Sequence, residues 1–203
     1  MGFLCLFGIV GNTVALIVLL KQRSQSATSF LLHTLAVADC LVLAATVPLY
    51  LLPNVFPYTG LLYGYHRIYL SIIPFLWPLH QIPYTWTIFL TVLLSLNRYL
   101  AVCRPFRPGR HLFGTTGQAK RHVLYLAAFS VVYNIPRFFE YQSKVVCVGH
   151  NASKEVFELS SIGHNKIYRI LYANLFYFLL IHGGPLLSLA FLNVKLIETL
   201  KVT

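Results

Sequence analysis

The stretch Ser95–Pro105 reads SLNRYLAVCRP and follows the longest charge-poor segment of the chain. Between Ile68 and Asn97 there is no Asp, Glu, Lys or Arg. As an α-helix this segment would measure about 45 Å, at about 1.5 Å per residue. Arg98 and three further arginines then follow within thirteen residues. A long apolar segment that ends in arginines is typical of a membrane-spanning helix that leaves the bilayer on the cytoplasmic side.

The composition also indicates a membrane protein. Hydrophobic residues make up 57% of the 203 residues and charged residues only 10%, whereas a soluble domain carries about 25% charged residues. The net charge of +11 comes from basic residues that lie between apolar segments, which argues against a nucleic-acid-binding protein. No metal-ligand cluster and no nucleophile–base pattern stands out in the sequence, so an enzyme is not expected.

The alternation of apolar and basic segments predicts an all-α membrane protein, a single transmembrane helix bundle over residues 1–203. We expect five spans, at residues 2–20, 29–52, 68–100, 122–136 and 170–194. Ten of the basic residues fall on one side of these spans and six on the other. Because basic loops stay in the cytoplasm, this distribution predicts an N-terminus outside and a C-terminus inside.

The sequence NRYLAVCRP at Asn97–Pro105 resembles the end of the third transmembrane helix in rhodopsin-like G-protein-coupled receptors. In that family an acid-Arg-Tyr triplet occupies this place, and the acid holds the arginine in the resting state. The resemblance implies that Asn97, Arg98 and Tyr99 take part in G-protein coupling. Asn97 replaces the acid, which predicts raised basal activity. The alternative is that the Arg-Tyr pair only anchors the helix at the membrane interface.

A second resemblance to the same family is the LAVAD sequence that ends at Asp39, near the middle of the second span. An ionised carboxylate at the bilayer centre costs about 2.5–3.5 kcal/mol, so we expect a proton, an ion or polar partners there. In the family this aspartate binds sodium, and Thr87 falls where a second oxygen ligand is placed. The resemblance implies a candidate Na⁺ site at Asp39 and Thr87, with no other cofactor or metal. The alternative is a protonated Asp39 in an ordinary interhelical hydrogen bond.

Ligand-binding residues are expected in the outer half of the bundle. His80, Gln81 and Tyr84 share roughly one face of the third span, at the depth where the family binds its ligands, and Tyr177 is expected to contribute from the last span. The alternative is that these side chains face neighbouring helices and satisfy each other.

The stretch YNIPRFFE at Tyr133–Glu140 resembles the corresponding stretch of invertebrate FMRFamide-type neuropeptide receptors. The resemblance implies a plasma-membrane receptor, surrounded by lipid, that binds an extracellular peptide and acts on a heterotrimeric G protein. An Arg-Phe-amide peptide is positively charged, so Glu140 is the expected partner of its arginine. Alternatively, Glu140 pairs with Arg137, one turn earlier.

Two further features concern the outer segments. The family usually has a disulfide bond at the outer end of the third helix, but no cysteine lies near Ile73, so we expect that bond to be absent and Cys147 to have no partner in this chain. The triplet Asn151-Ala152-Ser153 is an N-glycosylation sequon, which predicts a glycoprotein with this segment outside.

The third expected span contains three prolines, Pro74, Pro78 and Pro83. They predict either a kink in this helix or a helix that begins later than the apolar run.

The family has seven spans, so five spans imply a fragment or a truncated gene product. Two alternatives to a signalling receptor follow. One is a truncated receptor that does not signal and acts by pairing with full-length receptors. The other is a polytopic transporter or channel, in which Asp39 and His80 would lie on the ion path. The sequence shows neither an internal repeat nor paired broken helices, which a transporter would favour.

Overall fold

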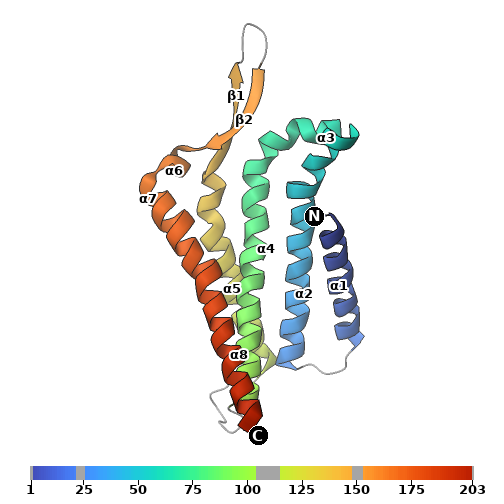
Figure 1. Ribbon diagram of the computed structural model, residues 1–203, viewed down its shortest axis with the longest axis vertical. Helices are drawn as coiled ribbons and strands as arrows, with labels where there is room; N and C mark the ends of the chain where they lie inside the picture. The colour runs from blue at the N-terminus through green and yellow to red at the C-terminus, as the bar shows by residue number, and fades with distance from the viewer. Residues whose placement is uncertain (1, 22–25, 104–114, 148–152, 203) are drawn as a thin grey trace.

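The computed structural model describes residues 2–21, 26–103, 115–147 and 153–202. These residues form a bundle of long helices with one β-hairpin above it (Figure 1). The long helices are α1 (Gly2–Lys21), α2 (Ala27–Thr46), α4 (Tyr63–Cys103), α5 (Thr116–Asn134) and α8 (Gly184–Val202). Four helical segments of the described chain are long and apolar enough to cross a membrane: Gly2–Lys21, Ala27–Thr59, Tyr63–Cys103 and Lys166–Lys201. The predicted all-α bundle is therefore confirmed, and the exact spans remain predictions.

Two helices begin earlier than the apolar pattern suggested. α4 begins at Tyr63 and contains Pro74, Pro78 and Pro83 inside one continuous helix. The three prolines therefore do not delay the start of this helix. α5 begins at Thr116, after a capping box in which Thr115 and Gln118 exchange hydrogen bonds. The end of the predicted basic loop is therefore helical.

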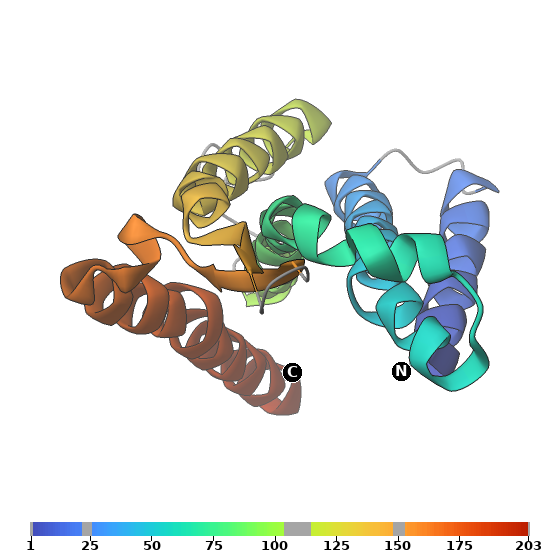
Figure 2. The same cartoon turned by 90° about the horizontal axis from the view of Figure 1, so that it is seen from above.

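α4 is the central helix of the bundle. It contacts α2, α5 and α8, and Figure 2 shows it between α2 and α5. The core joins α2, α4 and α5, because Leu31 and Ala38 of α2, Leu90 and Leu94 of α4, and Ala119 and Val123 of α5 form one buried cluster. Alanines let neighbouring helices approach closely, which favours van der Waals packing in a bilayer.

The last helical segment is not a uniform α-helix. It starts with α7 (Lys166–Tyr168), continues as the wider π-helical segments η4 (Arg169–Phe176) and η5 (Phe178–Gly183), and ends as α8. A Cβ atom on Gly184 would lie 2.6 Å from the carbonyl oxygen of Leu179, so this close approach requires glycine. π-helical turns often occur at functional sites, and this segment supplies one wall of the cavity described below.

The β-hairpin was not predicted from the sequence. β1 (Tyr141–Cys147) pairs antiparallel with β2 (Ser153–Leu159), and Tyr141 lies opposite Leu159. The Ser71 hydroxyl of α4 donates a hydrogen bond of 2.8 Å to Glu155 Oε2, which fixes β2 against the first part of α4. Short segments link the long elements: η1 (Val47–Leu51), η2 (Leu52–Asn54), α3 (Val55–Thr59), η3 (Ile135–Phe139) and α6 (Ser161–His164).

Candidate ligand pocket

A polar cavity of about 430 Å³ lies at the end of the bundle that carries the hairpin. Its walls come from α4, the end of the α5 segment, the hairpin and the last helical segment. The lining residues are Trp77, Gln81, Arg137, Glu140, Tyr141, Leu159, Arg169, Ala173, Asn174 and Tyr177. Three of the five residues predicted to bind ligand therefore line one cavity: Gln81, Glu140 and Tyr177.

A buried ion pair forms part of this cavity. The helix tightens after Asn134 into η3, which begins next to Pro136, and this turn places Arg137 and Glu140 on the same side. Arg137 Nη1 lies 3.6 Å from Glu140 Oε2, and only 6% and 8% of the two side chains are exposed. The structure therefore forms the pair that the sequence left open as an alternative for Glu140.

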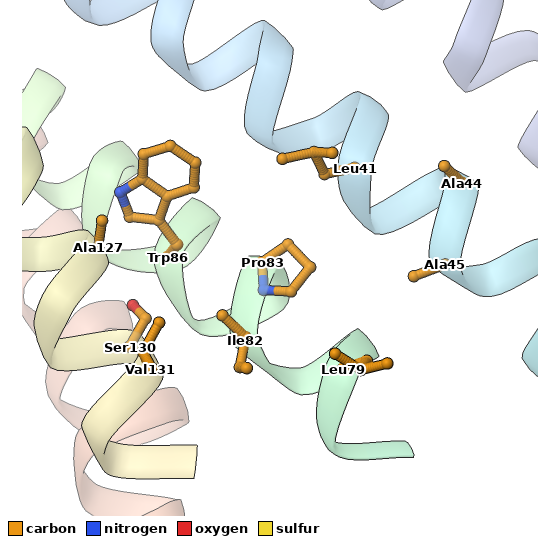
Figure 3. A pocket seen from close by; sticks show the side chains of 10 residues that line it. All are labelled: Leu41, Ala44, Ala45, Leu79, Ile82, Pro83, Trp86, Ala127, Ser130 and Val131. Carbon is orange, nitrogen blue, oxygen red and sulfur yellow. The ribbon is translucent and has the colours of Figure 1, made fainter. Parts of the chain in front are cut away.

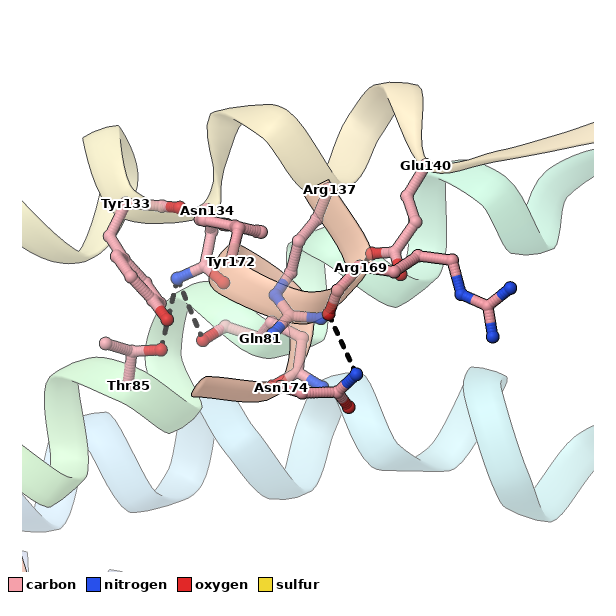
Figure 4. Close-up of polar contacts among 9 residues, drawn as sticks. All are labelled: Gln81, Thr85, Tyr133, Asn134, Arg137, Glu140, Arg169, Tyr172 and Asn174. Atoms are coloured by element: carbon pink, nitrogen blue, oxygen red, sulfur yellow. Dashed lines mark hydrogen bonds and ion pairs between the residues drawn. The ribbon is translucent and has the colours of Figure 1, made fainter. Parts of the chain in front are cut away.

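Aromatic rings surround the Arg137 guanidinium. Its central carbon lies 4.6 Å from the ring centre of Tyr177 and 5.7 Å from that of Tyr172. Figure 4 shows Arg137 close to Gln81 and Tyr172, with Glu140 above them. Cation–π contacts contribute about 0.5–2 kcal/mol, and most when desolvated. Arg137 thus links the end of the α5 segment to the last helical segment.

Several buried polar atoms around the cavity have no hydrogen-bond partner among the described residues. They include Arg137 Nε and Nη2, Glu140 Oε2 and Gln81 Oε1. A buried donor or acceptor without a partner costs about 1–3 kcal/mol. Burial also raises the pKa of Glu140 above its usual value, against the opposing effects of Arg137 and Tyr168. The cavity therefore presents donors and acceptors that can form hydrogen bonds with a molecule that enters it.

A buried asparagine below the cavity was missed at the sequence level. Asn134 Nδ2 donates to Thr85 Oγ1 at 3.1 Å and to the Gln81 carbonyl oxygen at 3.4 Å (Figure 4). It also donates to the Ser130 carbonyl oxygen, in its own helix, at 2.8 Å. The bonds to Thr85 and to the Gln81 carbonyl oxygen join α5 to α4 next to Gln81. An asparagine next to a long apolar run was the available signal, because such a residue needs polar partners inside a bundle.

His80 and Tyr84 do not line the polar cavity. His80 Nε2 lies 3.2 Å from Thr46 Oγ1 of α2, and its ring stacks on Tyr84 with 6.1 Å between the ring centres. Consecutive residues of an α-helix differ by about 100° in direction, so His80 points to α2 while Gln81 points to the cavity. The sequence alternative, in which these residues face a neighbouring helix, describes His80 in this structure.

The segment that follows β2 covers Glu140. The Ser160 backbone N–H donates to the Glu140 carbonyl oxygen at 3.0 Å. A Cβ atom on Gly163 of α6 would lie only 2.3 Å from the same carbonyl oxygen. The position of the Glu140 backbone therefore depends on a glycine at residue 163.

Replacing Gly163 by Ala is expected to destabilise the protein by about 1–3 kcal/mol, the usual cost of overpacking, and to weaken any ligand contact of Glu140. Thermal inactivation of the purified protein measures the first effect. Gly64→Ala is the control, because a Cβ atom there meets nothing within 4 Å. Equal stability of the Gly163→Ala and Gly64→Ala proteins would contradict this account of α6.

At the opposite end of α4, Asn97 contacts α2. Asn97 is 7% exposed, and its Nδ2 donates a hydrogen bond of 2.8 Å to Thr28 Oγ1. Arg98 is exposed and Tyr99 is half-buried. Asn97 thus joins two helices at the place where the family resemblance puts an acid, and it brings no charge to Arg98.

Asp39 and Thr87 lie near each other between α2 and α4. Their side chains do not close a hydrogen bond of ordinary geometry, because Thr87 Oγ1 is buried without a partner among the described residues. The predicted glycosylation residue, Asn151, lies outside the described residues, as does the side chain of Cys147. Of the cysteine side chains that the structure describes, Cys5, Cys40 and Cys103 are free.

Comparison with known proteins identifies the class of this bundle. Residues 11–203 match the model of the seven-transmembrane receptors of the rhodopsin family. The chain therefore belongs to this family, which confirms the resemblance of Asn97–Pro105 and of the sequence around Asp39. It is a multi-pass membrane protein, and its family identifies it as a receptor rather than an enzyme.

Curated relatives are named as peptide or hormone receptors. The chain is 30% identical over 196 residues to the FMRFamide receptor of Drosophila melanogaster, and the aligned region covers 96% of this chain and 35% of that receptor. It is 26% identical over 190 residues to an FMRFamide peptide receptor of Caenorhabditis elegans, over 93% and 42% of the two chains. It is 31% identical over 140 residues to the thyrotropin-releasing hormone receptor of Gallus gallus, over 67% and 32%. This chain thus spans less than half the length of these relatives.

Proposed function

We propose that this chain supplies part of a receptor for an extracellular, amidated neuropeptide of the FMRFamide type. The observation that carries the proposal is the polar cavity, in which Arg137, Glu140 and Gln81 hold buried polar atoms that make no hydrogen bond to the described residues. The printed names of the Drosophila and Caenorhabditis relatives support the same ligand class. A peptide that satisfies these atoms removes the cost of leaving them unpaired.

The pattern of unused atoms suits the C-terminus of such a peptide. A carboxamide offers a carbonyl oxygen that can accept from Arg137 Nε or Nη2, and an NH₂ group that can donate to Gln81 Oε1. A free carboxylate at the same place would have no N–H to donate to Gln81 Oε1, and its negative charge would lie near Glu140. In this proposal the arginine of the peptide binds Glu140 and competes with Arg137 for it, as an opposite charge favours the ionised carboxyl.

The proposed orientation puts the polar cavity outside and the NRY sequence inside the cell. The basic residues around Arg98 and near the C-terminal end of α8 favour this topology. An exposed Arg98 at the inner end of α4 is suited to contact a heterotrimeric G protein. Peptide binding between α4 and the last helical segment would bias the bundle toward the arrangement that binds the G protein.

The test of this function is receptor activation. Cells that express a receptor containing this chain should recruit a G protein when FMRFamide is added, measured by energy transfer between labelled receptor and G protein. A peptide with the same residues in scrambled order should have no effect. If neither FMRFamide nor other amidated neuropeptides produce recruitment in cells that display the receptor on their surface, the proposed function is wrong.

A sodium ion at Asp39 is a further part of the proposal. Hard cations take oxygen ligands, and the nearby Thr87 hydroxyl lacks a partner among the described residues, so these two side chains fit such an ion. We expect Asp39→Asn to abolish any increase in thermal stability that NaCl gives over the chloride of a large organic cation. Cys40→Ser, at the adjacent position, serves as the control. A sodium effect of the same size in Asp39→Asn would exclude this site.

A further inference from the structure

The polar cavity carries more positive than negative charge. Its charged lining residues are Arg137, Glu140 and Arg169, so two cations face one anion even when Glu140 is ionised. Arg137 and Glu140 form the buried pair at 3.6 Å, and no second acid of the lining is left to compensate Arg169. The peptide proposed above brings a further positive charge with its arginine. A ligand that also carries a negative charge is therefore favoured, because complementary charges give specificity.

The Arg169 side chain is accessible to a ligand. It is exposed, and its guanidinium forms no ion pair with the other described residues. Its backbone is held in place, because the Arg169 N–H donates to the Asn165 carbonyl oxygen at 3.0 Å and its carbonyl oxygen accepts from Asn174 Nδ2 at 2.8 Å. Figure 4 shows the guanidinium turned away from Arg137. The side chain therefore extends from a fixed point on the cavity wall.

Arg169 lies at the outer end of the cavity in the proposed topology. It precedes Tyr177 by eight residues in the last helical segment, on the side where this segment begins below the hairpin. Eight residues span about 12 Å at the α-helical rise of about 1.5 Å. Burial raises the pKa of Tyr141 at the base of the hairpin, and Arg169 is one of two arginines whose charge opposes this rise. The charge of Arg169 therefore acts where the cavity meets the hairpin.

The distance of about 12 Å indicates which part of the peptide reaches Arg169. In the proposed orientation the C-terminal carboxamide binds beside Arg137 and Gln81, at the level of Tyr177. An extended peptide advances about 3.3–3.6 Å per residue, so about 12 Å covers three to four residues. Counted from the C-terminal phenylalanine of Phe-Met-Arg-Phe, the fourth residue is the one directly before this sequence. That residue reaches the level of Arg169.

A second cavity offers no alternative place for a charged residue of the ligand. It has a volume of about 490 Å³ and lies between α2, α4 and α5 (Figure 3). Its described lining residues, among them Leu41, Pro83 and Trp86, include no charged side chain. A carboxylate there would lose its hydration without meeting a cation, which is costly. Selection for an acid therefore belongs to the polar cavity.

We propose that Arg169 binds a carboxylate of the peptide and so selects amidated neuropeptides with an acidic residue directly before Phe-Met-Arg-Phe. This inference rests on the proposed function, because it requires that the peptide binds in the polar cavity by its amidated end. Glu140 and Arg169 then recognise two opposite charges at two levels of one ligand. An arginine and a carboxylate can form two parallel hydrogen bonds, so the contact is selective in geometry as well as in charge.

Competition binding with two matched peptides tests this proposal. Acetyl-Asp-Phe-Met-Arg-Phe-amide and its Asn counterpart have nearly the same shape, and acetylation removes the amine that would neutralise the acid. In membranes containing the receptor, the Asp peptide should bind about fivefold more tightly, or about 1 kcal/mol, the upper range for an exposed ion pair. Arg169→Gln should reduce this ratio below about twofold. Its affinity for the Asn peptide should change less than about twofold, which shows that the variant is folded.

Arg67→Gln is the matched control. Arg67 is an exposed residue of α4, one turn before the Ser71 hydroxyl that binds the hairpin, and it does not line the polar cavity. This variant removes the same charge from the same end of the bundle, so its preference for the Asp peptide should be unchanged. A charge reversal gives a second readout: Arg169→Glu should bind the corresponding acetyl-Lys peptide more tightly than the acetyl-Asp peptide.

The outcomes distinguish this inference from the proposed function. Equal affinities of the Asp and Asn peptides for the unchanged receptor would overturn the inference and leave the proposed function intact. A preference that persists in Arg169→Gln, or that is lost equally in Arg67→Gln, would also overturn it, because the selecting charge would then lie elsewhere. No saturable binding of either peptide would contradict the proposed function and, with it, this inference.

Discussion

Replacing Glu140 by Gln is expected to weaken binding of an Arg-Phe-amide peptide at least about tenfold, which is about 1.4 kcal/mol. The amide keeps the shape of the side chain but removes the charge that the arginine of the peptide would meet. The same change leaves Arg137 buried without a counter-charge, and removing one partner of a buried ion pair costs about 3–5 kcal/mol. Competition binding measures the first effect and thermal inactivation measures the second.

A double variant separates the two roles of Glu140. Arg137→Gln combined with Glu140→Gln removes both charges, so it should regain much of the lost stability while peptide affinity stays low. Glu158→Gln is the matched control, because Glu158 is a partly exposed residue of β2 that pairs with Lys144 at 3.9 Å, and it should change affinity less than about twofold, as expected for a surface pair. Unchanged affinity in the single variant, or restored affinity in the double variant, would remove Glu140 from the peptide site.

Replacing Asn97 by Asp is expected to lower basal signalling about fivefold. The new carboxylate would lie beside Arg98 and stabilise the resting arrangement by about 1 kcal/mol, the upper range for an exposed ion pair. The same carboxylate can accept a hydrogen bond from the Thr28 hydroxyl, so the contact between α4 and α2 is kept. Constitutive G-protein recruitment, normalised to the amount of receptor at the cell surface, measures the effect.

The control for this prediction is Thr28→Val. It removes the hydrogen bond of 2.8 Å from Asn97 but adds no charge next to Arg98, so it should not lower basal signalling. If Asn97→Asp leaves basal signalling unchanged, the missing carboxylate does not set the basal level. If Thr28→Val lowers it equally, the interhelical contact is responsible instead of the charge.

The sequence predicted the helices well because their apolar segments are long. The segment between Ile68 and Asn97 contains no charged residue, and few structures other than a membrane helix suit such a segment. α4 contains all of it. The motifs at Asn97–Arg98 and Asp39 predicted the family, which the match over residues 11–203 confirmed. These features depend on local sequence and on the bilayer, so no tertiary contact was needed to find them.

Features that depend on tertiary contacts were not predicted. The β1–β2 hairpin has short strands with irregular alternation, and its position depends on the contact between Ser71 and Glu155, which are far apart in sequence. The separation of His80 from Gln81 depends on how α4 is rotated between α2 and the last helical segment. The start of α5 had a local signal, because Thr115 and Gln118 form a capping box, but the glycines and the proline of this segment favoured a loop.

The most direct test of the peptide-receptor proposal compares two ligands that differ in one terminal group. Membranes containing the receptor should bind FMRFamide saturably, and the same peptide with a free C-terminal carboxylate should bind at least about tenfold more weakly. The predicted reason is that the carboxamide can both accept from Arg137 and donate to Gln81 Oε1, whereas a carboxylate has no N–H to donate and brings a negative charge close to Gln81 Oε1 and Glu140. Equal affinity for the two peptides, or no saturable binding of either, would contradict the assignment of the polar cavity as an amidated-peptide site.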